Sequence, residues 1–207
     1  KGPLPCAATA DLSYNWGYNF TAFLIYADLA KQPAYAAVVE RALRALADPK
    51  YHAVPWARGG YDRGLADSVE GAIYLLATLP VPEAQRWVDA EAAVLKARQP
   101  WPLDKYGANI VRTALLYART KTRGAWLHPW RADVVWGAIE RDGELIVSAQ
   151  AEQPWQGRLV CDTARHETVL GFAKDYPRIN YLPADFIVRP DVRYEVSIGK
   201  TSKIVRG

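Results

Sequence analysis

Three short segments of the sequence combine polar and aromatic side chains at spacings that could support chemistry on a polar ligand. In the first, Asn15 and Asn19 are four residues apart, and Trp16 lies beside them. Residues four apart share one face of a helix, so the two amides and the indole predict a polar pocket lined by rings. The alternative is that both Asn side chains hydrogen-bond the local backbone, as Asn does near helix starts.

The second segment carries candidate acids and bases. Tyr61 and Asp62 lie in a glycine-rich stretch, and Asp67 and Glu70 follow three residues apart, on one face of a helix. Neighbouring carboxyl groups can act as an acid and a base, because a negative neighbour makes one of them retain its proton. The alternative is structural, since acidic residues near a helix N-terminus are favoured by the helix dipole.

The third segment could bind a carboxylate. Asn109, Arg112 and Thr113 share a helix face that follows Tyr106 and a glycine. Arginine can hold a carboxylate through two parallel hydrogen bonds. The alternative is that Asn109 caps the helix and Arg112 forms a surface ion pair.

These segments define the predicted site. The predicted catalytic residues are Tyr61, Asp62, Asp67 and Glu70. The predicted substrate-binding residues are Asn15, Trp16, Asn19, Trp56, Tyr106, Asn109 and Arg112. The tryptophans at 16, 56 and 101 could stack on sugar rings.

Helices must position these residues. Apolar residues recur at three- and four-residue spacing through the first part of the chain. The predicted helices run from Asp11 or Ser13 to Lys31, from Pro33 to a stop before Pro49, and over Leu65–Leu79, Glu83–Arg98 and Ala108–Thr122, with Gly124 ending the last. The first, third and fifth helices each open on one of the polar segments, so we expect the three segments to converge at one end of the helical scaffold.

After Gly124 the apolar period changes to two, which indicates strands. Asp142-Gly143 lies between two apolar runs, Val134–Ile139 and Leu145–Ala149, and predicts a hairpin. Gly157–Cys161, Phe186–Val188 and Arg193–Ile198 are predicted as further strands. The predicted fold class is therefore α+β, with antiparallel helical hairpins over residues 1–124 and a small antiparallel β-sandwich over residues 125–207.

Composition excludes several classes of protein. Of the 207 residues, 50% are hydrophobic and 23% are charged, and no apolar run is long enough for a membrane span, so neither a disordered nor a membrane protein is expected. The formal charge of +4 lies in residues 1–124, which hold 15 basic and 11 acidic residues, against 11 and 11 in the remainder. This excess favours an anionic ligand slightly but lacks the basic stripe of a nucleic-acid-binding protein.

No cofactor or metal is expected. The two cysteines, Cys6 and Cys161, and the three histidines, His52, His128 and His166, show no metal-ligand spacing. The motifs of serine hydrolases, phosphate-binding loops and dinucleotide-binding folds are absent from the sequence. A chain that contains no methionine and opens on Lys1 is interpreted as a processed product or a fragment of a longer protein.

Several segments resemble a known group of proteins. Tyr14–Asn19, Gly60–Asp62 with Ala66–Glu70, and Asn109 with Arg112–Ala114 are similar to bacterial (α/α)-toroid proteins of the polysaccharide lyase and glycoside hydrolase kind. The resemblance implies a toroid of paired helices followed by a β-sandwich. A whole toroid has about twice as many helices as this chain, so the chain resembles its later part, and a missing N-terminal part of the same protein is a possible partner.

The resemblance implies a carbohydrate-processing enzyme, or its C-terminal part, acting on an acidic polysaccharide or a uronate-containing oligosaccharide in the periplasm or outside the cell. In a lyase, Asn19, Asn109 or Arg112 would bind the uronate carboxylate and Tyr61 would transfer the proton. In a hydrolase, two of the three carboxyl groups of the second segment would act as acid and base. The alternative is a non-catalytic helical scaffold whose β-module binds a glycan or a protein.

Overall fold

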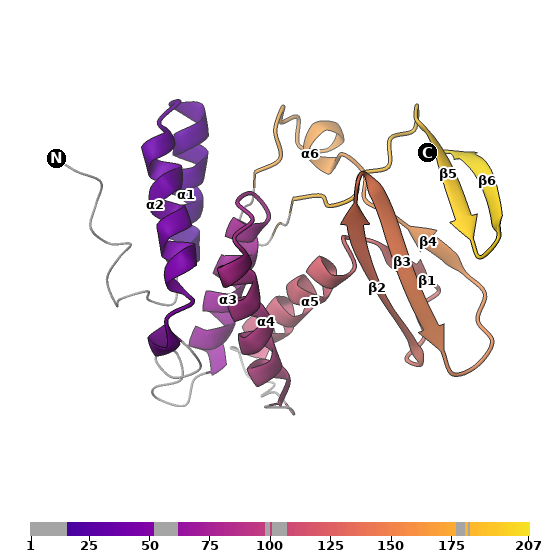
Figure 1. Cartoon of the computed structure of the whole chain (residues 1–207), viewed down its shortest axis with the longest axis horizontal. Coiled ribbons are helices and arrows are strands. Elements are labelled where there is room, and N and C mark those ends of the chain that lie inside the picture. Colours follow the sequence, from indigo (N-terminus) through magenta and orange to yellow (C-terminus); the bar gives the residue numbers. More distant parts are fainter. Residues whose placement is uncertain (1–15, 52–61, 98–99, 101–106, 177–180, 182) are drawn as a thin grey trace. The chain divides into compact units, whose positions relative to one another are not determined.

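The computed structural model describes residues 16–51, 62–97, 100, 107–176, 181 and 183–207. The side chains of residues 16, 18, 50 and 62–65 are not described. The fold is α+β, with helices preceding small antiparallel sheets (Figure 1). The chain divides into two compact units: the first holds residues 1–118 and 176–182, and the second holds residues 119–175 and 183–207.

The helices of the first unit follow the periodicity of the sequence. They are α1 (Trp16–Leu29), α2 (Pro33–Ala45), α3 (Asp62–Leu76), α4 (Pro82–Ala97) and α5 (Gly107–Lys121), with a 3₁₀ turn at Pro49–Tyr51. Proline opens α2 and α4, because its fixed φ suits the first helical position and its missing N–H costs nothing there. α3 was predicted over Leu65–Leu79, but it begins three residues earlier, at Asp62, and ends at Leu76. The last three residues of α5 belong to the second unit.

One apolar core holds these helices together. α1 packs against α2 and α3, and α3 packs against α4 (Figure 1). Fully buried members include Val39, Leu43 and Leu46 near α2, Val69 and Leu75 of α3, and Trp87 and Val88 of α4. The indole of Trp87 also donates a hydrogen bond to the carbonyl oxygen of Tyr51, at 2.9 Å, so that its buried N–H is paired.

Two glycines allow α1 and α3 to approach closely. A Cβ added at Gly17 would lie 2.2 Å from the Cα of Gly71, and one added at Gly71 would lie 2.8 Å from the Cα of Gly17. Neither position has room for a side chain, since the obstacle is backbone in both directions. Gly17, which stands inside the first polar segment, is therefore required by helix packing.

The second unit contains three antiparallel two-stranded sheets among its described residues: β1 (Trp126–His128) pairs with β4 (Arg158–Val160), β2 (Val134–Arg141) with β3 (Glu144–Ala151), and β5 (Arg193–Ile198) with β6 (Thr201–Arg206). The short helix α6 (Arg165–Thr168) follows β4.

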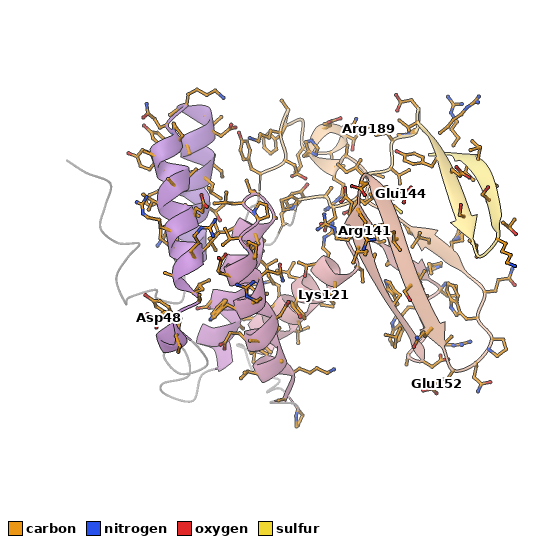
Figure 2. The ribbon with its side chains drawn as sticks, viewed as in Figure 1. Asp48, Lys121, Arg141, Glu144, Glu152 and Arg189 are labelled. Carbon is orange, nitrogen blue, oxygen red and sulfur yellow. The ribbon has the colours of Figure 1, made fainter. Side chains whose placement is uncertain are left out.

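The predicted hairpin is confirmed. Asp142 and Gly143 form its turn with φ values of 53° and 80°, the left-handed geometry that suits the twist of two paired strands. Arg141 and Glu144 face each other across the ladder beside this turn (Figure 2). Opposite charges at this position add a small cross-strand attraction.

The predicted strand at Phe186–Val188 is wrong. Ile187 forms only an isolated parallel bridge with Asp162, supported by a hydrogen bond of 2.9 Å from the Val188 N–H to the Asp162 carbonyl. One bridge does not extend into a ladder, and the segment runs as irregular chain. The strands β1 and β6 were not predicted.

Ion pairs tie the end of α5 to the segments on either side of this bridge. Asp162 accepts hydrogen bonds from the Arg119 guanidinium and from the backbone N–H of Asp185. Asp185 also lies 3.1 Å from Nη1 of Arg123. Burial raises the pKa of the Asp185 carboxyl, although Arg123 and Arg119 oppose the shift. α5 ends at Lys121, and Arg123, at φ +48°, takes the left-handed position predicted for Gly124; Gly124 follows it and donates its N–H to the Arg119 carbonyl oxygen at 3.2 Å.

Candidate functional site

Glu70 forms the centre of a polar cluster within the first unit. Its side chain is fully buried in the middle of α3. Tyr74, one turn further along α3, donates a hydrogen bond of 2.9 Å to Oε1 of Glu70. Nε and Nη2 of Arg112 on α5 lie 2.7 and 2.5 Å from Oε2. Both carboxylate oxygens are therefore bonded, which a buried carboxylate requires.

Asp67 lies one turn before Glu70 and on the same side of α3. Its Oδ1 is 3.8 Å from Nη2 of Arg112, so one guanidinium stands beside two carboxylates. The side chain of Asp67 is 13% exposed and that of Arg112 is 30% exposed. These two groups, unlike Glu70, can meet a ligand from solvent.

Thr113 fixes the position of α5 against α3. Its buried Oγ1 lies 3.1 Å from the carbonyl oxygen of Ala66 and 2.9 Å from that of Asn109. The contact to Ala66 joins the two helices one residue away from Asp67 and from Arg112. A hydroxyl that satisfies a neighbouring helix carbonyl in this way limits sliding of one helix along the other.

The cluster can orient a cation and present it beside a carboxylate. Glu70 holds the Nε–Nη2 edge of the guanidinium through charge-assisted hydrogen bonds, which are stronger than neutral ones. The exposed part of Arg112 can therefore bind an anionic group in one orientation. Glu70 itself, enclosed and bonded at both oxygens, is placed to position Arg112 and not to exchange protons with a ligand.

The structure brings three of the predicted site residues together: Asp67, Glu70 and Arg112 come from two segments that are far apart in the sequence. Asn109 lies one turn before Thr113 on α5 and is half-buried.

Asn19 is not part of the cluster. It is exposed on α1, two residues after Gly17. Two residues correspond to about 200° around a helix, and Gly17 faces α3, so Asn19 points away from α3.

The other predicted site residues lie outside the described part of the chain or have side chains that are not described. Asn15, Trp56, Tyr61 and Tyr106 belong to the first group, and Trp16 and Asp62, at the starts of α1 and α3, to the second. Their predicted roles remain predictions.

Sequence reasoning missed Tyr74. Its signal was present in the spacing, because a tyrosine four residues after a glutamate stands over it on a helix. That spacing is common, however, and becomes informative only once Glu70 is known to be buried.

Two kinds of feature do not occur in the described residues. Nowhere in that part of the chain do three or more His, Cys, Asp or Glu side chains gather as metal ligands. No helix within the same ranges has the length and apolar character needed to cross a membrane.

Comparison of the chain with models of known protein families, with curated proteins and with solved structures gave no match.

Proposed function

We propose that the chain is a carbohydrate-processing enzyme, or the C-terminal part of one, that acts on an acidic polysaccharide or a uronate-containing oligosaccharide. In this proposal the helices form the later part of an (α/α)-toroid, and the strands form an appended β-sandwich. Another part of the same protein would supply the remaining helices. Acidic polysaccharides lie outside the cytoplasm, so we also propose a periplasmic or extracellular location.

The observation that carries the proposal is the oriented, part-exposed guanidinium of Arg112. A buried carboxylate fixes it at 2.5–2.7 Å, and a second, part-exposed carboxylate stands beside it. An arginine held in this way can bind the carboxylate of a uronate and fix the sugar ring relative to Asp67. Anchoring a substrate by a non-reacting group is how binding energy is used to orient the reacting atoms.

Two reactions fit this arrangement. In a lyase, binding of the uronate carboxylate by Arg112 acidifies the adjacent C–H. A base, with Tyr61 as the candidate, removes that proton, the glycosidic C–O bond breaks, and the leaving oxygen takes up a proton. In a hydrolase, Asp67 and Asp62 act as acid and base, and their separation decides the stereochemical outcome. We assign Glu70 a positioning role in both.

The alternative, a non-catalytic scaffold whose β-module binds a partner, has an observation of its own. The sheets of the second unit carry exposed aliphatic side chains, notably Val135 at 68%, Ile198 at 78% and Ile204 at 64% exposed. Contact with a partner would remove such side chains from water, which stabilises a complex.

The proposal is tested with a panel of alginate, pectin and glycosaminoglycans. Ultraviolet absorbance detects the unsaturated product of a lyase, and a reducing-sugar assay detects either reaction. Arg112→Lys keeps the charge but loses the two-pronged geometry, and Asp67→Asn loses the carboxylate. Each should lower turnover by about 100-fold or more.

The matched control is Arg44→Lys. Arg44 also stands between two carboxylates of the first unit, Glu40 and Glu83, but on the exposed surface. This variant should turn over substrate as the unmodified chain does. A flat response over the whole panel, or equal losses in the three variants, contradicts the proposal and favours the scaffold.

A further inference from the structure

One face of the β1–β4 ladder combines an indole with an unpaired cation. Trp126 pairs with Val160 and His128 with Arg158, and paired residues in an antiparallel ladder point to the same face. Trp126 is 43% exposed, and His128 and Arg158 are exposed as well. Leu127, between them on the opposite face, is buried. The ladder therefore presents Trp126, His128 and Arg158 to solvent on one side.

The loops beside this ladder are tied down by hydrogen bonds. The guanidinium of Arg131 donates to the carbonyl oxygens of Gln153 and Pro154, at 2.8 and 3.0 Å, and pairs with Asp133. The indole N–H of Trp155 donates to the carbonyl oxygen of Pro129, at 3.1 Å. A surface supported in this way is ordered before a ligand arrives, which lowers the entropic cost of binding.

The charge of this face favours an anionic ligand. Its four residues, Trp126, His128, Arg158 and Val160, include no acid. The side chain of Arg158 makes no hydrogen bond or ion pair with another residue in the described part of the chain, whereas the side chains of Arg119, Arg123 and Arg131 are all paired. An exposed arginine without a carboxylate partner can bind an anion without first breaking an ion pair.

The geometry fits a cyclic sugar that carries a carboxylate. Diagonal neighbours across an antiparallel ladder, such as Trp126 and Arg158, have Cα atoms about 7–8 Å apart. A sugar ring can lie with its C–H face on the indole while its carboxylate reaches the guanidinium and its hydroxyls reach His128. Nucleic acid fits less well, because residues 125–207 hold 11 basic and 11 acidic residues and so have no net charge to attract it.

We propose that the Trp126–His128–Arg158 face of the β1–β4 ladder is a binding site for an anionic sugar residue of a polysaccharide, separate from the Glu70–Arg112 cluster. Such a site holds the polymer while another part of the protein acts on it. The choice of a polyuronate as its ligand rests on the proposed function.

Affinity electrophoresis of the full chain tests the site, with polygalacturonate or alginate in the native gel and hydroxyethyl cellulose as the neutral polymer. We expect the polyuronates to retard the unmodified chain and the neutral polymer to leave it unretarded. Trp126→Ala should weaken binding about tenfold, which is the scale of one aromatic contact. Arg158→Gln should weaken binding and also remove most of its sensitivity to salt.

Two matched controls separate the site from general surface effects. Phe172→Ala removes another exposed ring, and Arg206→Gln removes another exposed cation of the second unit. Both should bind as the unmodified chain does. All four substitutions are at exposed positions, and circular dichroism verifies that each variant is folded.

Several results would overturn the proposal: no retardation by either polyuronate, equal retardation by the neutral polymer, or equal losses in the site and control variants. Retardation by single-stranded DNA with the same dependence on Trp126 would show a general polyanion surface. A change in self-association of Trp126→Ala, without retardation of the unmodified chain, would show a protein-binding face. Binding and turnover are measured separately, so binding without turnover refutes only the enzyme, and turnover without binding at Trp126 refutes only this site.

Discussion

Removal of the guanidinium at position 112 should destabilise the first unit strongly. Arg112→Met keeps most of the apolar stem but leaves Glu70 buried without its cation. Breaking a buried ion pair by removing one partner costs about 3–5 kcal/mol. Because 30% of the Arg112 side chain is exposed, water can approach the vacated space, and we expect the lower end of that range, about 3 kcal/mol.

Substitution of the other partner, Glu70, should lower the free energy of unfolding less. Glu70→Gln keeps the volume and can still accept the hydrogen bond of Tyr74, which lies 2.9 Å away. It leaves Arg112 as the charged partner, but that guanidinium is part-exposed and still has Asp67 at 3.8 Å. We expect a loss of about 1–2 kcal/mol. The double variant Glu70→Gln/Arg112→Met should therefore lose less free energy of unfolding than the two single variants together, with a coupling energy of at least about 1 kcal/mol.

Urea unfolding followed by far-UV circular dichroism measures these differences. The signal reports the first unit, because α1–α4 and most of α5 belong to it. Arg44→Met is the control, since Arg44 pairs with Glu40 and Glu83 on the surface, and it should unfold at the same urea concentration as the unmodified chain. A loss below about 1 kcal/mol in Arg112→Met, or a coupling near zero, would show that Glu70 is not held as a buried ion pair.

Three further predictions concern other parts of the fold. Gly17→Ala should lower the melting temperature despite the better helix propensity of alanine, because its Cβ would meet the backbone of Gly71 at 2.2 Å. An unchanged melting temperature would refute that close approach. Gly143→Ala, at φ +80°, should cost about 1 kcal/mol through backbone strain alone, since open space surrounds the position; Gly143→Asn, which tolerates this geometry, should recover most of it. Asp185→Asn tests the carboxyl whose pKa burial raises. A carboxyl group with a raised folded pKa contributes stability below its unfolded pKa of 3.8 and loses that contribution as the pH rises through the folded pKa. Asp185→Asn should therefore gain stability relative to the unmodified chain as the pH rises from 3.8 toward neutrality. Urea titrations at each pH measure the difference.

The sequence alone predicted those elements that depend on a few neighbouring residues. Proline marks the start of α2 and α4, and Asp142-Gly143 supplies the turn geometry of the β2–β3 hairpin. The failures are non-local. Phe186–Val188 has the composition of a strand, but Ile187 finds only Asp162 as a bridge partner. A strand exists only where a second strand is available along its length, and that depends on the tertiary structure.

The candidate site also has a part that local sequence predicts and a part that it does not. The spacing of Asp67 and Glu70 places both on one side of α3, as the sequence indicates. The encounter of Glu70 with Arg112, 42 residues further along the chain, follows from helix packing and has no local signal. The burial of Glu70 has no local signal either, because glutamate is seldom fully buried unless it is paired. The structure shows this candidate acid or base to be buried and bonded at both carboxylate oxygens, which is why we propose a positioning role for it.

The buried pair is a costly way to stabilise two helices, and this cost bears on its role. Apolar residues of similar volume often stabilise a fold as well as a buried ion pair does or better, because they avoid the desolvation of two charges. Packing of Gly17 on Gly71 and the contact of Thr113 with Ala66 already fix the helices on both sides of Glu70. What the pair adds is an oriented guanidinium, so the double variant Glu70→Leu/Arg112→Met should be about as stable as the unmodified chain and yet fail to turn over or bind a uronate at this cluster. A double variant that is stable and active would show that the pair has no part in the function, and one as unstable as Arg112→Met alone would show that it serves the fold.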